Sequence, residues 1–267
     1  MKKNIKKWGF RGMKSKKASI VKKAGHKTEN ILAFLIGVPV ENILTGTGKI
    51  DLTNKEGDSI SLKSSHDKKG RSQICLYSYD SDYFKIKNVS AVKMKECLEV
   101  FPKTKEEYRL NRLSVKKNLQ PKMVELKNYI NASNKNKKEF LSFIFFTTTT
   151  GKTIDFLIVT DQKLSFYVFD ASEVVDTFCK KTIVENSKAR HPLEMSNLKV
   201  LFKGKNEKGK YVNLIENEIR TSTHYRRFLS VGNKTKYLFV LLSNIKPHKK
   251  VKDKLILCGK AISSFKF

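Results

Sequence analysis

The stretch GKIDLTNKEGDSISLK, residues 48–63, is typical of a β-hairpin with one apolar face and one polar face. Side chains alternate between the two faces of a strand, so Ile50 and Leu52 should face a core while Asp51 faces the other way. The NKEGD segment at 54–58 supplies the Asn, Gly and Asp residues that tight turns favour. The sequence therefore predicts two antiparallel strands on either side of this turn.

The second strand of the predicted hairpin repeats the alternation. Ile60 and Leu62 form its apolar pair, which leaves Ser61 and Lys63 on the polar face with Asp51. A carboxylate next to a lysine can hold a hard divalent cation and orient the water that the cation acidifies, as phosphodiester hydrolysis requires. An ordinary amphipathic hairpin with a surface Asp and Lys has the same spacing, so the pattern alone leaves both interpretations open.

The charge balance of the chain indicates a polyanionic partner. Of 267 residues, 55 are basic and 25 acidic, which gives a formal charge of +30 and a pI near 9.9. Such a field attracts nucleic acid, and counterion release makes the binding strong. A lysine-rich codon usage or a need for solubility would also give lysines over the whole length. The apolar content of 39% is enough for one domain or two small ones.

The sequence predicts a cytoplasmic protein without a membrane span. Its longest apolar run, residues 31–40, is far shorter than the roughly twenty residues that cross a bilayer. The basic N-terminus is not followed by the apolar region and cleavage site of a signal peptide. The cysteines are scattered and lack the CxxC spacing of zinc clusters. This distribution is typical of reduced thiols in a cytoplasm. They are Cys75, Cys97, Cys179 and Cys258.

Residues 28–37, TENILAFLIG, predict a helix that starts with a capping Thr28. Glu29 falls on the same stripe of this helix as Leu32 and Ala33. An inward carboxylate is costly to bury unless a cation or a lysine lies nearby. Alternatively, Glu29 is an acid in the first helical turn, where the helix dipole favours it.

The remaining segments predict an arm, helices, a linker and strands. Residues 1–27 predict a basic N-terminal arm, and residues 92–129 predict helices interrupted near Pro102 and Pro121. The polar stretch NASNKNKK, residues 131–138, predicts a linker. The second half predicts antiparallel strands, a helix over 171–181 capped by Asp170 and an irregular segment over 182–198. The predicted strands are 140–147, 153–160, 164–169, 199–202 and 211–215, with a mixed region over 237–267.

An acid on a helix, Asp51 on a strand, a Gly turn and Ser61-Leu62-Lys63 on the next strand follow one another here. In this order the chain resembles the PD-(D/E)xK nucleases, and among them the type II restriction endonucleases. Asp51 matches the opening Asp, residues 61–63 match the D/E-x-K tripeptide and Glu29 matches the acid on the preceding helix. The resemblance implies an α+β fold around an α/β core, with a mixed β-sheet flanked by helices as in restriction endonucleases. Additional antiparallel strands are implied in the C-terminal half, which is faintly similar to the Hha-type enzymes.

Two positions depart from the motif of that family. Ile50 stands in place of the nominal Pro, which is often replaced. Ser61 stands where a second acid is usual, so a metal ion would lack one negative ligand. Glu29 is the preferred source of that ligand, and Glu56 or Asp58 in the turn are the alternatives.

The resemblance implies Mg²⁺-dependent hydrolysis of phosphodiester bonds. Mg²⁺ is expected on Asp51, on the Leu62 backbone carbonyl and, through water, on Glu29. Lys63 is expected to orient the attacking water and to stabilise the charge that develops in the transition state. Ser61 is expected to hydrogen-bond a metal-bound water. No small-molecule cofactor is expected.

The resemblance also implies a homodimer that cuts double-stranded DNA at a short specific site. Residues 28–130 would form the catalytic region and 139–267 the DNA-recognition region, or the two would be one intertwined domain. Polar segments between strands are the expected base readers, although each arginine could instead contact phosphate or lie on the surface. The candidates are Gln73, Arg71, Asn186, Ser187, Arg190, His191, Asn197, Arg220 and Arg226.

Two other functions fit the sequence. A non-catalytic nucleic-acid-binding protein, associated with RNA or the ribosome, would explain the charge of +30 equally well. It would not explain why Asp51 and Lys63 share a face, or why Glu29 faces inward. A structure-specific repair nuclease of the same fold is the third possibility.

Overall fold

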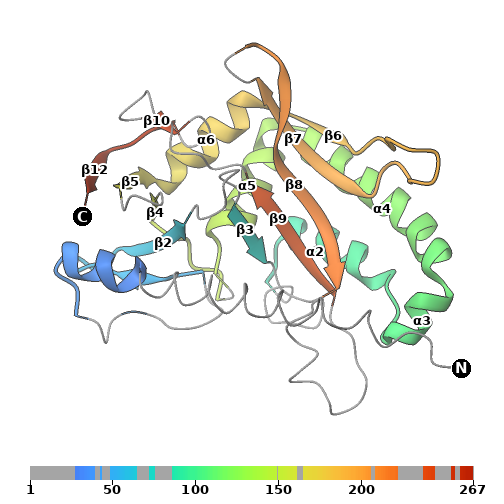
Figure 1. Cartoon of the computed structure of the whole chain (residues 1–267), viewed down its shortest axis with the longest axis horizontal. Helices are drawn as coiled ribbons and strands as arrows, with labels where there is room; N and C mark the ends of the chain where they lie inside the picture. The colour runs from blue at the N-terminus through green and yellow to red at the C-terminus, as the bar shows by residue number, and fades with distance from the viewer. Residues whose placement is uncertain are drawn as a thin grey trace, which may run out of the picture.

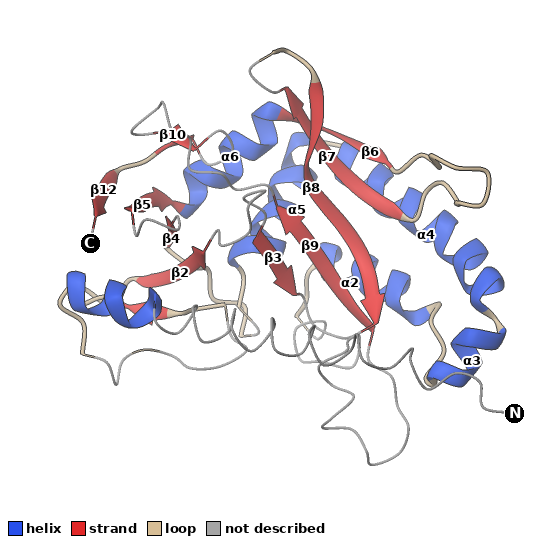
Figure 2. Cartoon of the chain, viewed as in Figure 1, coloured by secondary structure: helices blue, strands red, loops and turns tan. Residues whose placement is uncertain are grey.

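The computed structural model describes residues 28–39, 43, 49–64, 72–75, 86–148, 150–160, 165–205, 208–221, 237–243, 254–255 and 259–266. In this part of the chain, helices flank two five-stranded sheets in an α+β architecture, as the sequence predicts (Figures 1 and 2). The predicted basic arm at 1–27 lies outside the described residues. Among the helices that are described, none is both long and apolar enough to cross a membrane.

The first sheet contains the predicted hairpin. Its strands lie in the order β1-β2-β4-β5-β12, and it is mixed, because β2 pairs parallel to β4 while the other pairs are antiparallel. A parallel pair needs a long crossover connection, and helices supply it here. The strands are β1 (Leu52–Thr53), β2 (Ser59–Ser64), β4 (Phe156–Thr160), β5 (Ser165–Asp170) and β12 (Ser263–Lys266).

The turn between β1 and β2 forms as predicted. The N–H of Asp58 donates to Asn54 Oδ1 (2.7 Å), and the Asn54 amide donates to Asp58 Oδ2 (2.9 Å). Gly57 has a φ of 90°, in the left-handed region that favours glycine. Local Asx chemistry therefore fixes this turn.

The crossover helices begin with α2 (Val89–Glu99), α3 (Lys105–Leu110) and α4 (Arg112–Asn131). The predicted interruption near Pro102 is confirmed, but the one near Pro121 is wrong, because α4 runs through it. A proline removes one intrahelical hydrogen bond. An unbroken buried stripe on α4 offsets that loss. It consists of Val115, Leu119, Met123, Leu126 and Ile130.

The strand predicted at 140–147 and the linker predicted at 131–138 are both wrong. These residues form the end of α4, a short corner and α5 (Asn134–Phe146). Ser133 Oγ accepts the N–H of Asn136 (3.0 Å) and caps the helix. The run FLSFIFF at 140–146 is buried at every position but one, so it lacks the polar face that distinguishes a helix from a buried strand.

The predictions for residues 153–181 are confirmed. β4 and β5 pair antiparallel, and α6 (Ala171–Lys181) follows β5 directly. Asp170 Oδ1 accepts the N–H of Glu173 (2.9 Å), which is the predicted N-cap. Hydrogen bonds from Ser172 and from the Glu173 N–H lower the pKa of the Asp170 carboxyl.

The second sheet has the order β3-β9-β8-β7-β6, with antiparallel pairs. It packs against α2 and α4. The strands predicted at 199–202 and 211–215 are confirmed and are longer than predicted, and the segment predicted as irregular begins with β6. The strands are β3 (Ser72–Cys75), β6 (Thr182–Asn186), β7 (Lys199–Lys205), β8 (Tyr211–Thr221) and β9 (Tyr237–Ser243). A separate antiparallel pair is formed by β10 (Lys254–Leu255) and β11 (Gly259–Lys260).

The main core takes residues from both sides of the predicted linker at 131–138, from α2 and α4 before it to α5, α6 and the second sheet after it. One core cluster therefore contains residues of both predicted regions. A smaller cluster lies on one face of the first sheet, where residues 28–35 form a helix. It includes Leu32, Ala33, Leu52, Ile60, Leu62, Ile158 and Phe166.

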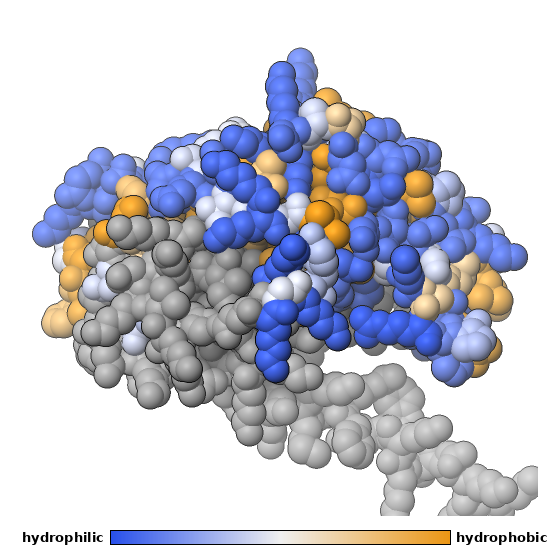
Figure 3. Space-filling model, turned by 90° about the horizontal axis from the view of Figure 1, so that it is seen from above, coloured by the Kyte–Doolittle hydropathy of each residue, from blue (hydrophilic) through white to orange (hydrophobic). Residues whose placement is uncertain are grey.

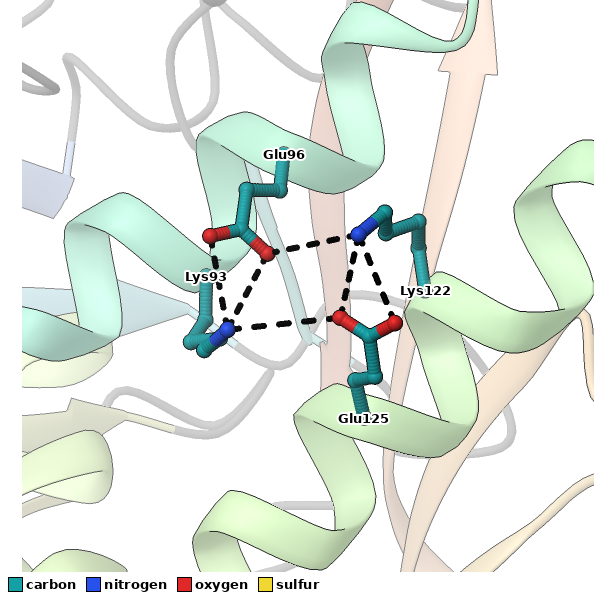
Figure 4. Close-up of polar contacts among 4 residues, drawn as sticks. All are labelled: Lys93, Glu96, Lys122 and Glu125. Carbon is teal, nitrogen blue, oxygen red and sulfur yellow. Dashed lines mark hydrogen bonds and ion pairs between the residues drawn. The ribbon is translucent and has the colours of Figure 1, made fainter.

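A network of ion pairs links the outer surfaces of α2 and α4 (Figure 4). Lys122 Nζ lies 3.1 Å from Glu125 Oε2 and 3.8 Å from Glu96 Oε2, while Lys93 Nζ lies 3.1 Å from Glu96 Oε2. Partly exposed pairs of this kind contribute about 0 to 1 kcal/mol each. The network thus helps to align the two helices, while their apolar stripes hold them together.

Candidate functional site

One carboxylate oxygen of Asp51 collects three donors from the neighbouring strand. Asp51 Oδ2 accepts the Leu62 N–H (2.7 Å), Lys63 Nζ (3.3 Å) and Ser61 Oγ (3.4 Å). The backbone holds these groups in register, because the Asp51 N–H donates to the Ile60 carbonyl (2.9 Å). The predicted convergence of Asp51, Ser61 and Lys63 is therefore present in the structure. Asp51, Ser61, Leu62 and Lys63 are called the candidate site below.

The polar face of the hairpin is covered, unlike that of an ordinary surface hairpin. β2 lies between β1 and β4, and Ser61 is only 1% exposed. The side chains of Asp51 and Lys63 are 19% and 20% exposed, so they lie at the edge of this covered region. A charged pair in such a position interacts more strongly than one at the surface.

The hairpin departs from the predicted alternation at Ile50. Leu52 belongs to the smaller cluster, as do Ile60 and Leu62, but Ile50 packs against the main core. Strand pairing in the ladder starts at Leu52, so the two-residue period does not extend back to Ile50.

Lys63 Nζ also lies within hydrogen-bond distance of two oxygen atoms. It lies 3.3 Å from Asp51 Oδ2 and 3.2 Å from the Leu62 carbonyl oxygen. A carboxylate and a backbone carbonyl are hard donors of the kind that Mg²⁺ binds, usually together with waters and substrate phosphates. These two oxygens and the Ser61 hydroxyl therefore fit a Mg²⁺ ion by their chemistry. They supply a single negative charge, and within the described residues no group of three or more His, Cys, Asp or Glu side chains is arranged to hold a metal.

The predicted third ligand comes from a helix on the other face of the sheet. Residues 28–35 pack Leu32 and Ala33 into the smaller cluster with Leu62, whereas Ser61 and Lys63 point to the opposite face. Glu29 is half-buried on this helix. Its approach to the Asp51 carboxylate stays a prediction.

The two turn acids lie at the other end of β2 from Lys63. Glu56 is exposed, and Asp58 Oδ2 accepts the Asn54 amide inside the turn. Asp58 also lines a groove of about 930 Å³ between the turn, α5 and α6. Neither acid is among the groups that contact Asp51 in the described hydrogen bonds.

That groove is rich in acids, but each of them already has a partner on this chain. Asp155 Oδ2 accepts both the N–H and the Oγ of Ser59 (2.7 Å each), which lowers the pKa of the Asp155 carboxyl. Asp170 caps α6, Asp176 pairs with Lys138 (2.6 Å) and Glu139 accepts the Tyr129 hydroxyl (3.3 Å). Anionic DNA would be repelled here, so the groove is a poor candidate for the substrate site.

A buried lysine that sequence reasoning missed lies two residues before Asp51. Lys49 is 8% exposed, and its Nζ donates to the carbonyls of Phe143 and Ile144 (2.8 Å each). Burial, and after it the positive charge of Lys63, lower the pKa of Lys49 well below its usual value. Nothing in the sequence distinguishes Lys49, because lysines occur throughout the chain and its partners lie in α5.

The predicted base readers around the β6–β7 connection divide into two groups. Asn186 and Ser187 hold the loop: the Asn186 amide donates to the Met123 carbonyl (3.0 Å), and Ser187 Oγ accepts the N–H of Leu198 (3.2 Å). Asn197 has a φ of 58° and closes the loop through its N–H to the Ser187 carbonyl (2.7 Å).

Arg190 and His191 instead lie exposed near the tip of this loop, residues 187–198. Figure 1 shows the loop beside α4, where the Gln120 amide donates to the Ser196 carbonyl (2.9 Å). From above, hydrophilic side chains dominate the described surface of the molecule (Figure 3). The loop is therefore an ordered projection with basic residues at its end.

The other predicted base readers have no described side-chain placement. Gln73 lies on β3 opposite Leu242, and Arg220 lies on β8 opposite Leu238. Arg71 and Arg226 lie outside the described residues.

Comparison of the chain with protein-family models, with curated proteins and with solved structures gave no match.

Proposed function

We propose that this protein is a Mg²⁺-dependent endonuclease of the PD-(D/E)xK type that cuts double-stranded DNA at a short specific site, as type II restriction endonucleases do. The observation that carries the proposal is the meeting of Asp51, the Leu62 carbonyl and Lys63 at a partly covered point of a central mixed sheet. The large positive charge of the chain supports a polyanionic substrate. Along the chain, a helix, Asp51, a turn and the strand with Lys63 follow one another. This is the order of the motif in the nucleases that the sequence resembles.

The residues of the candidate site divide the work of phosphodiester hydrolysis. Asp51 and the Leu62 carbonyl would hold the metal. Glu29, the proposed further ligand through water, would have to reach it around the edge of the sheet, because its helix packs on the other face. When bound, Mg²⁺ polarises the scissile phosphate and lowers the pKa of a coordinated water. Lys63 would orient the attacking water and stabilise the negative charge that grows on the phosphate oxygens. Ser61 donates to Asp51 Oδ2 and keeps the carboxylate in place.

DNA recognition falls, in this proposal, to the 187–198 loop and to lysines that contact phosphates. Arg190 and His191 are exposed on the loop, and arginine can bind guanine with two hydrogen bonds. The loop is held by backbone contacts on both sides, so presenting these side chains costs little conformational entropy. A homodimer would place two such loops on a palindromic site.

Incubation of the protein with phage DNA and Mg²⁺ tests the proposal. Discrete fragments are expected, and mapping their ends gives the recognition site. A smear would indicate a nuclease without sequence specificity, such as a repair enzyme acting on structure. Binding of DNA without cleavage in Mg²⁺, Mn²⁺ or Co²⁺ would refute the enzyme.

One observation favours a non-catalytic nucleic-acid-binding protein as the second candidate. Ser61 replaces an acid and is 1% exposed, so no second carboxylate stands beside Asp51 on β2. Replacing Ser61 by Asp or Glu separates the two. If the wild type cuts DNA and Ser61→Asp cuts it equally well or better, the nuclease is supported. If the wild type only binds DNA and Ser61→Asp cuts it, the non-catalytic binding protein is supported.

A further inference from the structure

Lys49 connects the segment that carries Asp51 to the carboxyl end of α5. The last four carbonyls of a helix have no partner within it, and α5 has no basic residue in its own last turn. Lys49 Nζ donates to two of these carbonyls, those of Phe143 and Ile144. A cation at this end is also favoured by the helix dipole. These contacts offset part of the cost of burying the ammonium group.

The end of α5 is in turn fixed to the strand beside Lys63. The Ile154 N–H donates to the carbonyl of Phe146 (2.8 Å), and residue 156 begins β4. β4 pairs in parallel with β2, where Lys63 lies opposite Val159. Lys49 therefore joins the Asp51 segment to the same rigid unit that holds Lys63.

We propose that Lys49 is a positioning residue of the candidate site, which keeps the Asp51 carboxylate against the Leu62 N–H and Lys63. The role rests on the nuclease function proposed above. Lys49 touches neither metal nor DNA in this role and acts through Asp51. Nuclease geometry is sensitive to shifts of this kind, since a displacement of about 1 Å can lower a rate about a hundredfold.

Lys137 is a matched control within the same protein. It is also 8% exposed, and its Nζ donates to the carbonyls of Cys179 (2.8 Å) and Thr182 at the carboxyl end of α6. It makes the same kind of contact as Lys49, but it is not adjacent in sequence to any residue of the candidate site. A purely structural role for Lys49 would make the two lysines equivalent.

The experiment compares Lys49→Met and Lys137→Met in the full-length chain. Both should lower the thermal midpoint by similar amounts. Only Lys49→Met should lower kcat for DNA cleavage, by about tenfold or more, with little change in DNA affinity measured in Ca²⁺. Only Lys49→Met should also speed the exchange of the Leu62 N–H with solvent, followed by NMR without DNA or metal.

Equal losses of kcat in the two variants, or an unchanged Leu62 exchange rate in Lys49→Met, would overturn the positioning role. If the wild type does not cut DNA, the nuclease proposal fails while the Leu62 exchange comparison still decides the role of Lys49. If Lys49→Met does not fold, Lys49→Arg replaces it, because it keeps the charge and N–H donors. If Lys49→Arg lowers kcat, the Leu62 N–H of this variant should also exchange faster with solvent. A lower kcat with an unchanged exchange rate contradicts the proposal.

Discussion

Lys63 Nζ on β2 lies 3.3 Å from Asp51 Oδ2, although Asp51 directly precedes β1 and a turn separates the two residues in the sequence. Strand register brings them together, and the Leu62 N–H fixes the same carboxylate oxygen at 2.7 Å. The pair is thus oriented by backbone atoms as well as by its own attraction.

Asp51→Asn should abolish cleavage, because it removes the only negative charge among the proposed inner ligands while keeping the shape of the side chain. A fall of at least about a hundredfold in the cleavage rate is expected, with DNA binding largely retained. Asp155→Asn is the control, since Asp155 also accepts donors from β2 but at its opposite end. Comparable losses in both variants would argue against the assignment of Asp51.

Lys63→Met should abolish cleavage yet tighten the binding of a divalent cation. Lys63 Nζ lies within 3.3 Å of both Asp51 Oδ2 and the Leu62 carbonyl, so its charge competes with a metal for the same oxygens. Removing a charge at this range is expected to raise the affinity about tenfold. The affinity is measured by titration with Mn²⁺ in the absence of DNA, followed by EPR. Weaker Mn²⁺ binding in Lys63→Met would contradict the idea that Lys63 competes with the metal.

Asn217→Leu should stabilise the protein. Asn217 on β8 is fully buried, and among the described residues neither its amide nitrogen nor its amide oxygen has a hydrogen-bond partner. Leucine has the same number of side-chain heavy atoms and no polar group, so a gain of about 1–3 kcal/mol is expected in the free energy of unfolding. Urea denaturation gives this value.

Asn186→Leu is the matched control for that prediction. The Asn186 amide donates to the carbonyls of Met123 (3.0 Å) and Lys199 (3.4 Å), so the same exchange removes satisfied hydrogen bonds there. It should destabilise the protein. A loss of stability in both variants would show that Asn217 has a partner in solution.

Acid should destabilise the first sheet through Asp155. Hydrogen bonds from Ser59 lower the folded pKa of Asp155 below its usual 3.8. A depressed folded pKa gives stability that is present above the unfolded pKa and is lost as the pH falls through the folded value. Asp155→Asn should therefore flatten the fall in thermal midpoint below about pH 4. If the thermal midpoints of the wild type and the variant fall equally below about pH 4, this role of Asp155 is contradicted.

The sequence by itself determined the elements whose contacts are short in range. The turn at 54–58 follows from Asx and Gly chemistry within five residues, and the Asp170 cap of α6 follows from a contact to Glu173. The shared face of Asp51 and Lys63 follows from strand alternation across that turn. In each case the side chains that decide the structure are near neighbours in the chain.

Only the tertiary structure decided the features that depend on distant partners. Residues 140–146 form a helix because they are surrounded by the core, so their pattern carries no helical period. Asn186 and Ser187 serve the loop because α4 and β7 supply carbonyl and N–H groups to them. Lys49 is buried because the end of α5, more than ninety residues away, offers it the carbonyls of Phe143 and Ile144. Such pairings are set by packing, and a linear pattern of residue types does not encode them locally.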